Sequence, residues 1–329
     1  CEGAQAPYHP ELQIPVNPWD ATRWSGVSSS GSGVATAAGL CFGSIGTDTG
    51  GSIRYPSAVN GCVGLKPTYG RISRHGVFPL AESMDHVGPM TRTVEDAAIM
   101  YDAMAGFDPR DGTSLPDSAL TVRSQLGRGI EGLRIGFDQT YATKNVDTEV
   151  AAAIEQVVVR LRQLGAEIVE VAMPDLGNPT EIWYTLGTVE AALAHRATFP
   201  QRADEYGPGL RSDLEYGLQL DAVDYARAAR ARAEISGRVH AMLNGVDCFV
   251  CPSMSNTARR KSKNPFEIDA EEWYRLVIND VFSKPFNFSG VPTLCVPCGF
   301  SSDGLPISAQ FVGSQLAEAK VLRAGHAYE

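Results

Sequence analysis

Positive charge is scarce in this sequence. Its 329 residues contain 28 Lys and Arg against 38 Asp and Glu, which leaves a formal net charge of −10. A chain with this balance repels polyphosphate, so we do not expect nucleic acid as a partner. Charged residues make up 20% of the chain and hydrophobic residues 43%, the composition of a globular protein with a large buried core.

Long apolar runs are missing as well. Residues 1–5 lack the basic start and the apolar stretch of a signal peptide. The stretch Trp24–Thr47 carries no charge, but it is rich in Ser, Gly and Thr and is too polar to insert into a bilayer. We therefore expect a cytoplasmic protein that does not bind a membrane. The chain begins without Met and stops inside a predicted helix, so we expect both ends to be cut.

Cysteines are few, and their odd number of seven is typical of free thiols in a reducing compartment. Cys248 and Cys251 have the spacing of zinc ligands, and so do Cys295 and Cys298. Both pairs lie in apolar, β-branched stretches, however, where residues three apart point to opposite faces of a strand. We therefore expect buried small side chains rather than a metal site, and no cofactor is predicted.

Hydrophobic periodicity predicts an α/β fold. The clearest unit is a strand over 133–138, an amphipathic helix over 147–164 and a strand over 166–171, which together form a βαβ unit. Further strands are predicted over 40–46, 246–252 and 291–298, and further helices over 34–40, 52–60, 93–105, 179–243 and 318–328. We expect a single domain, residues 1–329, in which helices cover both faces of a mixed, largely parallel β-sheet.

A glycine-rich loop carries the strongest chemical signal. In residues 49–52, Thr-Gly-Gly-Ser, successive backbone N–H groups enter a helix, and the missing side chains let a substrate oxygen approach. Such a loop can stabilise the oxyanion that forms when a serine attacks an amide carbonyl. The loop lacks the lysine of a phosphate-binding loop and the pattern of a dinucleotide fingerprint or a nucleophile elbow. A second serine cluster at 28–30 favours catalysis over a simple helix cap at Ser52.

The serine cluster and the glycine-rich loop belong to a longer series of motifs. The series is Ser28-Ser-Ser-Gly31, Gly46-Thr-Asp-Thr-Gly-Gly-Ser-Ile-Arg-Tyr-Pro-Ser57, Gly64-Leu-Lys-Pro-Thr-Tyr-Gly-Arg71, Ser83-Met-Asp-His-Val-Gly-Pro-Met-Thr-Arg92, Phe286-Asn-Phe-Ser-Gly-Val-Pro292 and Gly304-Leu-Pro306. In this order the motifs resemble the amidase signature family, densely over 15–105 and more loosely elsewhere. The resemblance implies the amidase signature fold and the hydrolysis of amides.

The same resemblance implies a Ser–Ser–Lys proton relay. Ser52 would be the nucleophile, and Ser28 would pass the Ser52 proton to a neutral lysine and later protonate the leaving amine. In this family the bridging serine follows a cis peptide bond, here Val27–Ser28. The oxyanion would be held by four backbone N–H groups, those of Thr49, Gly50, Gly51 and Ser52.

The lysine of that relay has no match in the sequence. The family places it well upstream of the serine cluster, whereas no lysine precedes Ser28 here. The first lysine is Lys66, which does not correspond to the catalytic position. We therefore expect that the sequence omits an N-terminal segment of the working enzyme, and we do not assign Lys66 to the role of the base.

Other polar residues near the motifs have structural interpretations. Asp48 and Arg54 flank the nucleophile loop, and we expect them to tie it by hydrogen bonds. Asp85 and His86 raise the alternative of a Ser–His–Asp triad, but adjacent residues cannot easily line up in that way.

The helical region 175–285 resembles the family least, and we expect it to face the substrate. Its aromatic residues Trp183, Tyr184 and Tyr216 are expected either to line a pocket or to pack in the core.

The sequence thus predicts a hydrolase that cleaves a small carboxylic amide, or a related anilide, ester or carbamate, through an acyl-Ser52 intermediate. Two alternatives stay open. One is a glutaminase-type amidotransferase A subunit, and the other is a non-catalytic fragment or remnant of the fold. The expected partner is a small-molecule amide substrate, and a homodimer is left open.

Overall fold

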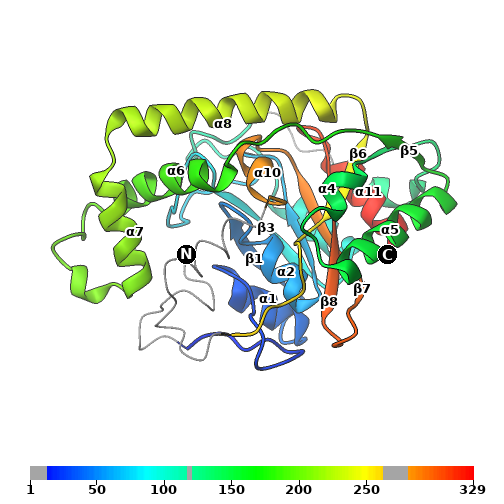
Figure 1. The fold of residues 1–329 in the computed structure, drawn as a ribbon, viewed down its shortest axis with the longest axis horizontal. Coiled ribbons are helices and arrows are strands. Elements are labelled where there is room, and N and C mark those ends of the chain that lie inside the picture. Colours follow the sequence, from blue (N-terminus) through cyan, green and yellow to red (C-terminus); the bar gives the residue numbers. More distant parts are fainter. Residues whose placement is uncertain (1–12, 117–120, 262–280) are drawn as a thin grey trace.

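The computed structural model describes residues 13–116, 121–261 and 281–329. Its strands are β1 (Gly43–Asp48), β2 (Val63–Lys66), β3 (His86–Thr91), β4 (Arg134–Phe137), β5 (Glu167–Glu170), β6 (Cys248–Pro252), β7 (Thr293–Phe300) and β8 (Pro306–Val312). They form one eight-stranded sheet in the order β1-β3-β2-β7-β8-β6-β4-β5 (Figure 1). The motif-rich strands β1, β2 and β3 therefore lie at one end of the sheet, and the predicted βαβ unit lies at the other.

The sheet is mixed, as predicted, but the prediction that it is largely parallel is wrong. In the described part of the chain β4 pairs parallel with β5 and β6, whereas the other five pairings are antiparallel. Parallel pairing needs a long crossover, and the helix between β4 and β5 supplies one. Only residues 301–305 separate β7 from β8, which is too short for a crossover, so these strands form an antiparallel hairpin.

The predicted helices are present, with shifts of a few residues at their ends. They are α1 (Ser30–Ala37), α2 (Arg54–Asn60), α3 (Val94–Met104), α5 (Thr148–Gln163), α6 (Pro179–Ala194), α7 (Pro208–Gln219), α8 (Ala222–Leu243) and α11 (Glu318–Tyr328), with the shorter α4 (Gln139–Thr143), α10 (Lys284–Phe288), η1 (Arg123–Arg128) and η2 (Ala203–Glu205). The stretch 179–243 divides because Pro208 begins α7 and the capping box of Asp221 begins α8. Figure 1 shows α8 along the top of the molecule, above α6 and α10.

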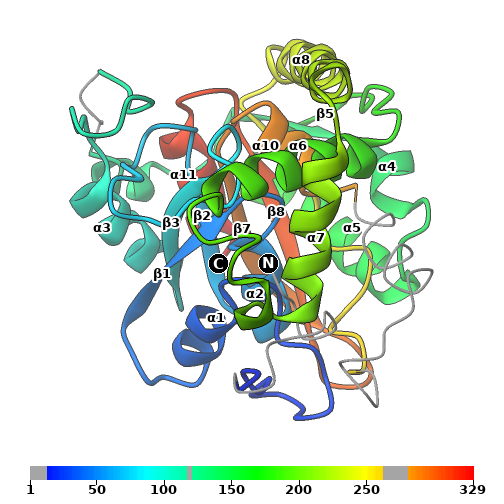
Figure 2. The same cartoon turned by 90° about the vertical axis from the view of Figure 1, so that its left-hand side faces the viewer.

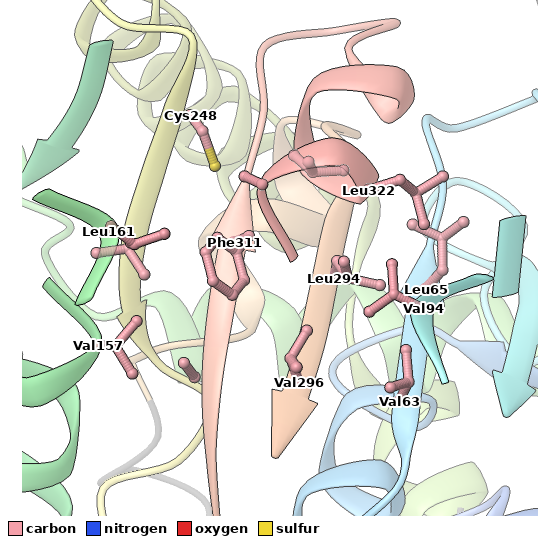
Figure 3. Packing of buried hydrophobic residues seen from close by; sticks show 14 of the residues in the cluster. Val63, Leu65, Val94, Val157, Leu161, Cys248, Leu294, Val296, Phe311 and Leu322 are labelled. Atoms are coloured by element: carbon pink, nitrogen blue, oxygen red, sulfur yellow. The ribbon is translucent and has the colours of Figure 1, made fainter. Parts of the chain in front are cut away.

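Helices cover both faces of the sheet, as predicted. On one face α3, α5 and α11 pack against the strands, and Figure 3 shows part of this cluster: Val63, Leu65, Val94, Val157, Leu161, Cys248, Leu294, Val296, Phe311 and Leu322. On the other face α6, α8 and α10 pack around Phe249 and Cys251 of β6. Cys248 and Cys251 thus point to opposite faces, which confirms that part of the prediction. Burial raises the pKa of the Cys248 thiol to about 12.

Two general features of the described residues bear on function. They contain no group of three or more His, Cys, Asp or Glu side chains placed to hold a metal ion. Each helix within these ranges is too short or too polar to span a bilayer.

Candidate active site

The loop that carries Ser52 joins β1 to α2 and is folded around the carboxylate of Asp48. One oxygen of Asp48 accepts a hydrogen bond from the Gly51 amide at 2.8 Å, and the other accepts one from the Ile53 amide at 3.1 Å. Gly51 has a φ of +130°, and a Cβ atom there would collide with the ring of Tyr55. The tight turn before Ser52 therefore requires glycine at position 51.

Arg54 holds Asp48 from the side opposite the loop. Its side chain is fully buried, and all five N–H groups donate hydrogen bonds. Nε and Nη2 donate to Asp48 at 2.9 Å each, Nη2 also donates to Asn287 at 2.5 Å, and Nη1 donates to the Ser283 carbonyl at 3.0 Å and to Gln310 at 3.1 Å. Burial alone would raise the pKa of Asp48, but the Arg54 guanidinium outweighs it and holds this pKa well below its usual range. The Ser52 loop thus rests on a buried, fully hydrogen-bonded ion pair.

Three side chains hold the loop from its outer side. The Thr49 hydroxyl donates to Asp85 at 2.5 Å, and the indole Nε1 of Trp183 donates to the Thr49 carbonyl at 2.9 Å. The hydroxyl of Ser283 donates to the Gly50 carbonyl at 2.7 Å. Burial raises the pKa of Asp85 in spite of the hydrogen bond that its carboxylate accepts from Thr49.

The loop's backbone N–H groups divide into two kinds. The Gly51 amide is committed to Asp48, as described above. The amides of Thr49, Gly50 and Ser52 donate to no other residue within the described ranges. Three of the four amides expected at an oxyanion hole therefore have no hydrogen-bond acceptor among the described residues.

Ser28 lies on the segment that packs against the start of α2. A Cβ at Gly26 would lie 2.6 Å from Pro56, so the two segments are in close contact. The hydroxyl of Ser29 bonds to the backbone of Thr47 at 3.0 Å and 3.2 Å, which joins the serine cluster to the end of β1. Ser28 itself is exposed, and in the described part of the chain no hydrogen bond connects it to Ser52.

The expected cis bond at Val27–Ser28 is not found, so this prediction is wrong for the structure. Within the described ranges the cis peptide bond is Phe199–Pro200, and Ser28 instead adopts a positive φ of 25°. A non-proline cis bond costs about 2.5–4 kcal/mol and persists only where contacts enforce it. The exposed Ser28 side chain makes no hydrogen bond within the described ranges that would enforce the cis form.

A cavity of about 190 Å³ opens beside the two serine segments. Its lining consists of Ser28, Thr47, Thr49, Val77, Phe78, Pro79, Leu80, Asp85, His195 and Leu210. Most of this lining is apolar, and burial lowers the pKa of His195, which favours its neutral form. The only carboxylate in the lining, Asp85, is already bonded to Thr49 and to the Leu80 amide.

Two buried ionisable residues lie close to the ion pair without bonding to either serine. Lys66 donates to the carbonyls of Val291 at 2.6 Å and Pro67 at 3.3 Å. Burial, and after it the charge of Arg54, lowers the pKa of Lys66 well below its usual value. Nδ1 of His86 lies 2.7 Å from the Met84 carbonyl, so it donates there, and within the described ranges no hydrogen bond joins the ring to the Asp85 carboxylate. This geometry gives no support to a histidine-based triad.

Sequence reasoning missed several residues that surround the loop. Asn287 lies inside a family-like motif, so its position was a signal that could have been used. Ser283 lies outside every motif, and nothing in the sequence connects it to the loop. Trp183 was expected to line a pocket or to pack in the core, but its contact with the loop was not predicted. Tyr184 of α6 and Tyr216 of α7 stack on each other at 5.1 Å, and neither lines the cavity. Figure 2 shows these two helices side by side.

Comparisons with known proteins identify the family of the chain. The model of the Amidase family matches residues 5–322. The AmiD protein of Mycobacterium tuberculosis, which carries the name of an amidase, is 42% identical over all of this chain and 68% of its own length. The glutamyl-tRNA(Gln) amidotransferase A subunit of Chloroflexus aggregans is 38% identical over 96% of this chain and 68% of its own length. The solved structure of 6-aminohexanoate cyclic dimer hydrolase superimposes with a TM-score of 0.89 at 27% identity, over 99% of this chain and 72% of its own. The chain therefore belongs to the amidase signature family and is an amide hydrolase.

Proposed function

We propose that the protein hydrolyses neutral, apolar carboxylic amides through an acyl intermediate on Ser52. The observation that carries this proposal is the Asp48 carboxylate, which binds the Gly51 amide and leaves the neighbouring amides of Gly50 and Ser52 without a described partner. Unpaired N–H groups beside a buried serine are suited to an oxyanion, because they stabilise the charge that develops on the carbonyl oxygen.

The proposed reaction has two stages. Ser52 Oγ attacks the carbonyl carbon while its proton passes to Ser28, which in the same step gives its own hydroxyl proton to the base. The tetrahedral oxyanion receives hydrogen bonds from the amides of Thr49, Gly50 and Ser52. Collapse breaks the C–N bond, and Ser28 delivers a proton to the leaving amine. Water then attacks the acyl-Ser52 ester by the reverse proton path, which releases the acid and restores the serine.

The ultimate base is not assigned to a residue of this sequence. The resemblance gives that role to a lysine upstream of the serine cluster, a position that no lysine occupies here. Lys66 is unsuited because its amine donates to two backbone carbonyls and not to a serine.

The cavity beside Ser28 supports an apolar substrate. Val77, Phe78, Pro79 and Leu80 form one wall, and His195 and Leu210 of the helical region 175–285 contribute the other. No Lys or Arg is among these lining residues, so the α-carboxylate of glutamine would lack a counter-ion there. We therefore favour an amide, anilide, ester or carbamate with an apolar acyl group over the glutaminase reaction of an amidotransferase.

A fluorophosphonate probe with intact-mass analysis tests the proposal. We expect one adduct that maps to Ser52 and no adduct in Ser52→Ala, together with loss of turnover. Ser28→Ala should lower turnover by roughly 10²–10⁴-fold, the usual contribution of proton transfer. Labelling elsewhere, or full turnover in Ser52→Ala, would contradict the mechanism. Absence of any adduct would favour a non-catalytic remnant, and preference for glutamine over phenylacetamide would favour the amidotransferase reaction.

A further inference from the structure

Trp183 of α6 lies directly on the nucleophile loop. Its indole Nε1 donates to the Thr49 carbonyl at 2.9 Å, across 134 residues of sequence. A Cβ atom at Gly50 would lie 2.6 Å from the same Nε1, so the indole packs on the bare face of that glycine. The indole therefore touches the Thr49–Gly50 peptide unit, whose N–H is one of the candidate oxyanion donors.

Because the peptide group is rigid, the contact of Trp183 with the Thr49 carbonyl also affects the direction of the Gly50 N–H. In a planar trans peptide the C=O and the following N–H point in opposite directions. A donor that fixes the Thr49 carbonyl therefore also fixes the direction of the Gly50 N–H. The next peptide, Gly50–Gly51, is held at both ends, by Ser283 on its carbonyl and by Asp48 on its N–H. The Thr49–Gly50 peptide has the Trp183 indole as its only hydrogen-bond partner within the described ranges.

Other contacts hold Trp183 and its helix in place. Lys284 Nζ lies 5.6 Å from the centre of the indole ring, within the range of a cation–π interaction. Glu190, two turns along α6 from Trp183, accepts hydrogen bonds from the amide and hydroxyl of Ser83 at 2.9 Å and 2.6 Å. Ser83 precedes Asp85, which binds the Thr49 hydroxyl. Helix α6 thus reaches Thr49 from two sides, directly and through the segment that carries Asp85.

We propose that Trp183 is a positioning residue that orients the Gly50 N–H toward the oxyanion. This inference rests on the proposed acyl-Ser52 mechanism and adds to it a residue from outside the family-like motifs. The indole itself does not contact the substrate. It holds one donor in the direction that the transition state requires, so its loss should reduce kcat more than it changes KM.

The test compares three replacements in the complete protein. Trp183→Phe removes the N–H donor but keeps an aromatic ring. Replacement of Trp183 by 3-benzothienylalanine removes the donor and keeps the shape of the indole. Tyr184→Phe is the matched control, because it removes a hydrogen bond of the same helix, to Asp213 at 2.7 Å, that does not reach the loop.

We expect both Trp183 replacements to lower kcat by about 10–100-fold, less than outright loss of an oxyanion donor, with KM changed by less than about threefold. A trifluoromethyl ketone, which forms a tetrahedral oxyanion on a serine, should lose affinity in parallel with kcat. Tyr184→Phe should change neither quantity by more than about twofold. Wild-type kcat in the benzothienyl protein would overturn the proposal.

A second measurement keeps this inference separate from the proposed function. If the wild-type protein neither turns over nor labels at Ser52, the mechanism fails, and hydrogen–deuterium exchange over residues 47–56 then decides about Trp183. The proposal expects faster exchange in that segment for Trp183→Phe and unchanged exchange for Tyr184→Phe. Equal exchange in both variants would overturn it.

Discussion

The nucleophile loop and the helical region use the same kinds of charged side chains in opposite ways. In the loop, the side chains of Asp48 and Arg54 are 0% exposed and lie 2.9 Å apart. On α8, Arg230 and Glu234 also pair, at 3.1 Å, but their side chains are 84% and 52% exposed. The buried pair cannot lose one member without leaving an unpaired charge in the core, whereas the exposed pair can be solvated by water. The buried pair of the loop is therefore intolerant of change, whereas the exposed pair on α8 tolerates substitution.

The largest expected effect is the difference in stability loss between replacing Arg54 and replacing Arg230. Arg54→Met leaves the Asp48 carboxylate buried without its cation, and we expect it to lower the free energy of unfolding by about 3–5 kcal/mol. Arg230→Met removes an exposed pair on a helix and should cost less than about 0.5 kcal/mol. Urea unfolding followed by circular dichroism measures both values. Similar losses in the two variants would show that burial does not separate the two regions.

A second contrast uses glycines of the same two regions. Gly51→Ala places a methyl group against the Tyr55 ring at a φ of +130°. We expect a loss of about 2–4 kcal/mol in the free energy of unfolding, from backbone strain and overpacking together. Gly187 lies inside α6, and a Cβ added there would meet no atom within 4 Å other than the backbone of its own helix. Gly187→Ala should therefore stabilise the protein by about 0.5–1 kcal/mol. Thermal unfolding of both variants tests this difference. The prediction is wrong if both substitutions shift the midpoint of unfolding in the same direction.

The sequence predicted the helical and βαβ part of the fold better than the motif-bearing part. Helix α5 and strands β4 and β5 follow from hydrophobic periodicity, and the observed α11 spans the predicted residues 318–328. Strands β2, β3 and β8 were not predicted, because their residues are buried on both faces and show no alternation. Without them, the pairing directions of the sheet could not be derived.

Prediction of the site depended in the same way on local signals. Motifs located Ser28, Ser52 and the loop between β1 and α2. The contacts that hold the loop come from residues such as Trp183 and Ser283, which approach only when the chain has folded. Their identity depends on long-range packing, which the pattern of a single segment does not encode.

A third contrast concerns pH. An unfolded lysine stays protonated up to a pH of about 10.4, but the pKa of Lys66 is lowered well below this value by burial and by Arg54. Between the two pKa values the unfolded state binds more protons, so the free energy of unfolding rises with pH by up to about 1.4 kcal/mol per pH unit. Lys66→Met should abolish this contribution. Lys320→Met, which removes a half-exposed amine paired with Asp247 at 2.7 Å, should not.

Urea titrations at several pH values between about 7 and 8.5 measure this slope. Unfolded thiols begin to ionise in this range, but they are the same in both proteins and cancel in the difference. The unfolding free energy of the wild-type protein minus that of Lys66→Met should increase as the pH rises. A constant difference would mean that Lys66 keeps its proton in the folded protein over this range, and the contrast with Lys320 would then disappear.

The smallest effect is expected from the replacement of an exposed phenylalanine. Comparing Phe78 with Phe42 separates the proposed site from the rest of the surface. Phe78 lines the cavity beside Ser28, and its ring lies 5.0 Å from that of His195. Phe42 is 91% exposed in the turn before β1 and lines none of that cavity. If the cavity receives an apolar acyl group, Phe78→Ala should lower kcat/KM for phenylacetamide by roughly 3–10-fold, the value of one aromatic contact.

The same substitution should have a smaller effect on acetamide, which is too short to reach the ring, and Phe42→Ala should affect neither substrate. Equal losses for both amides in Phe78→Ala would mean that this ring supports the loop structure rather than the acyl group, and the acyl site would then have to be sought elsewhere around Thr49.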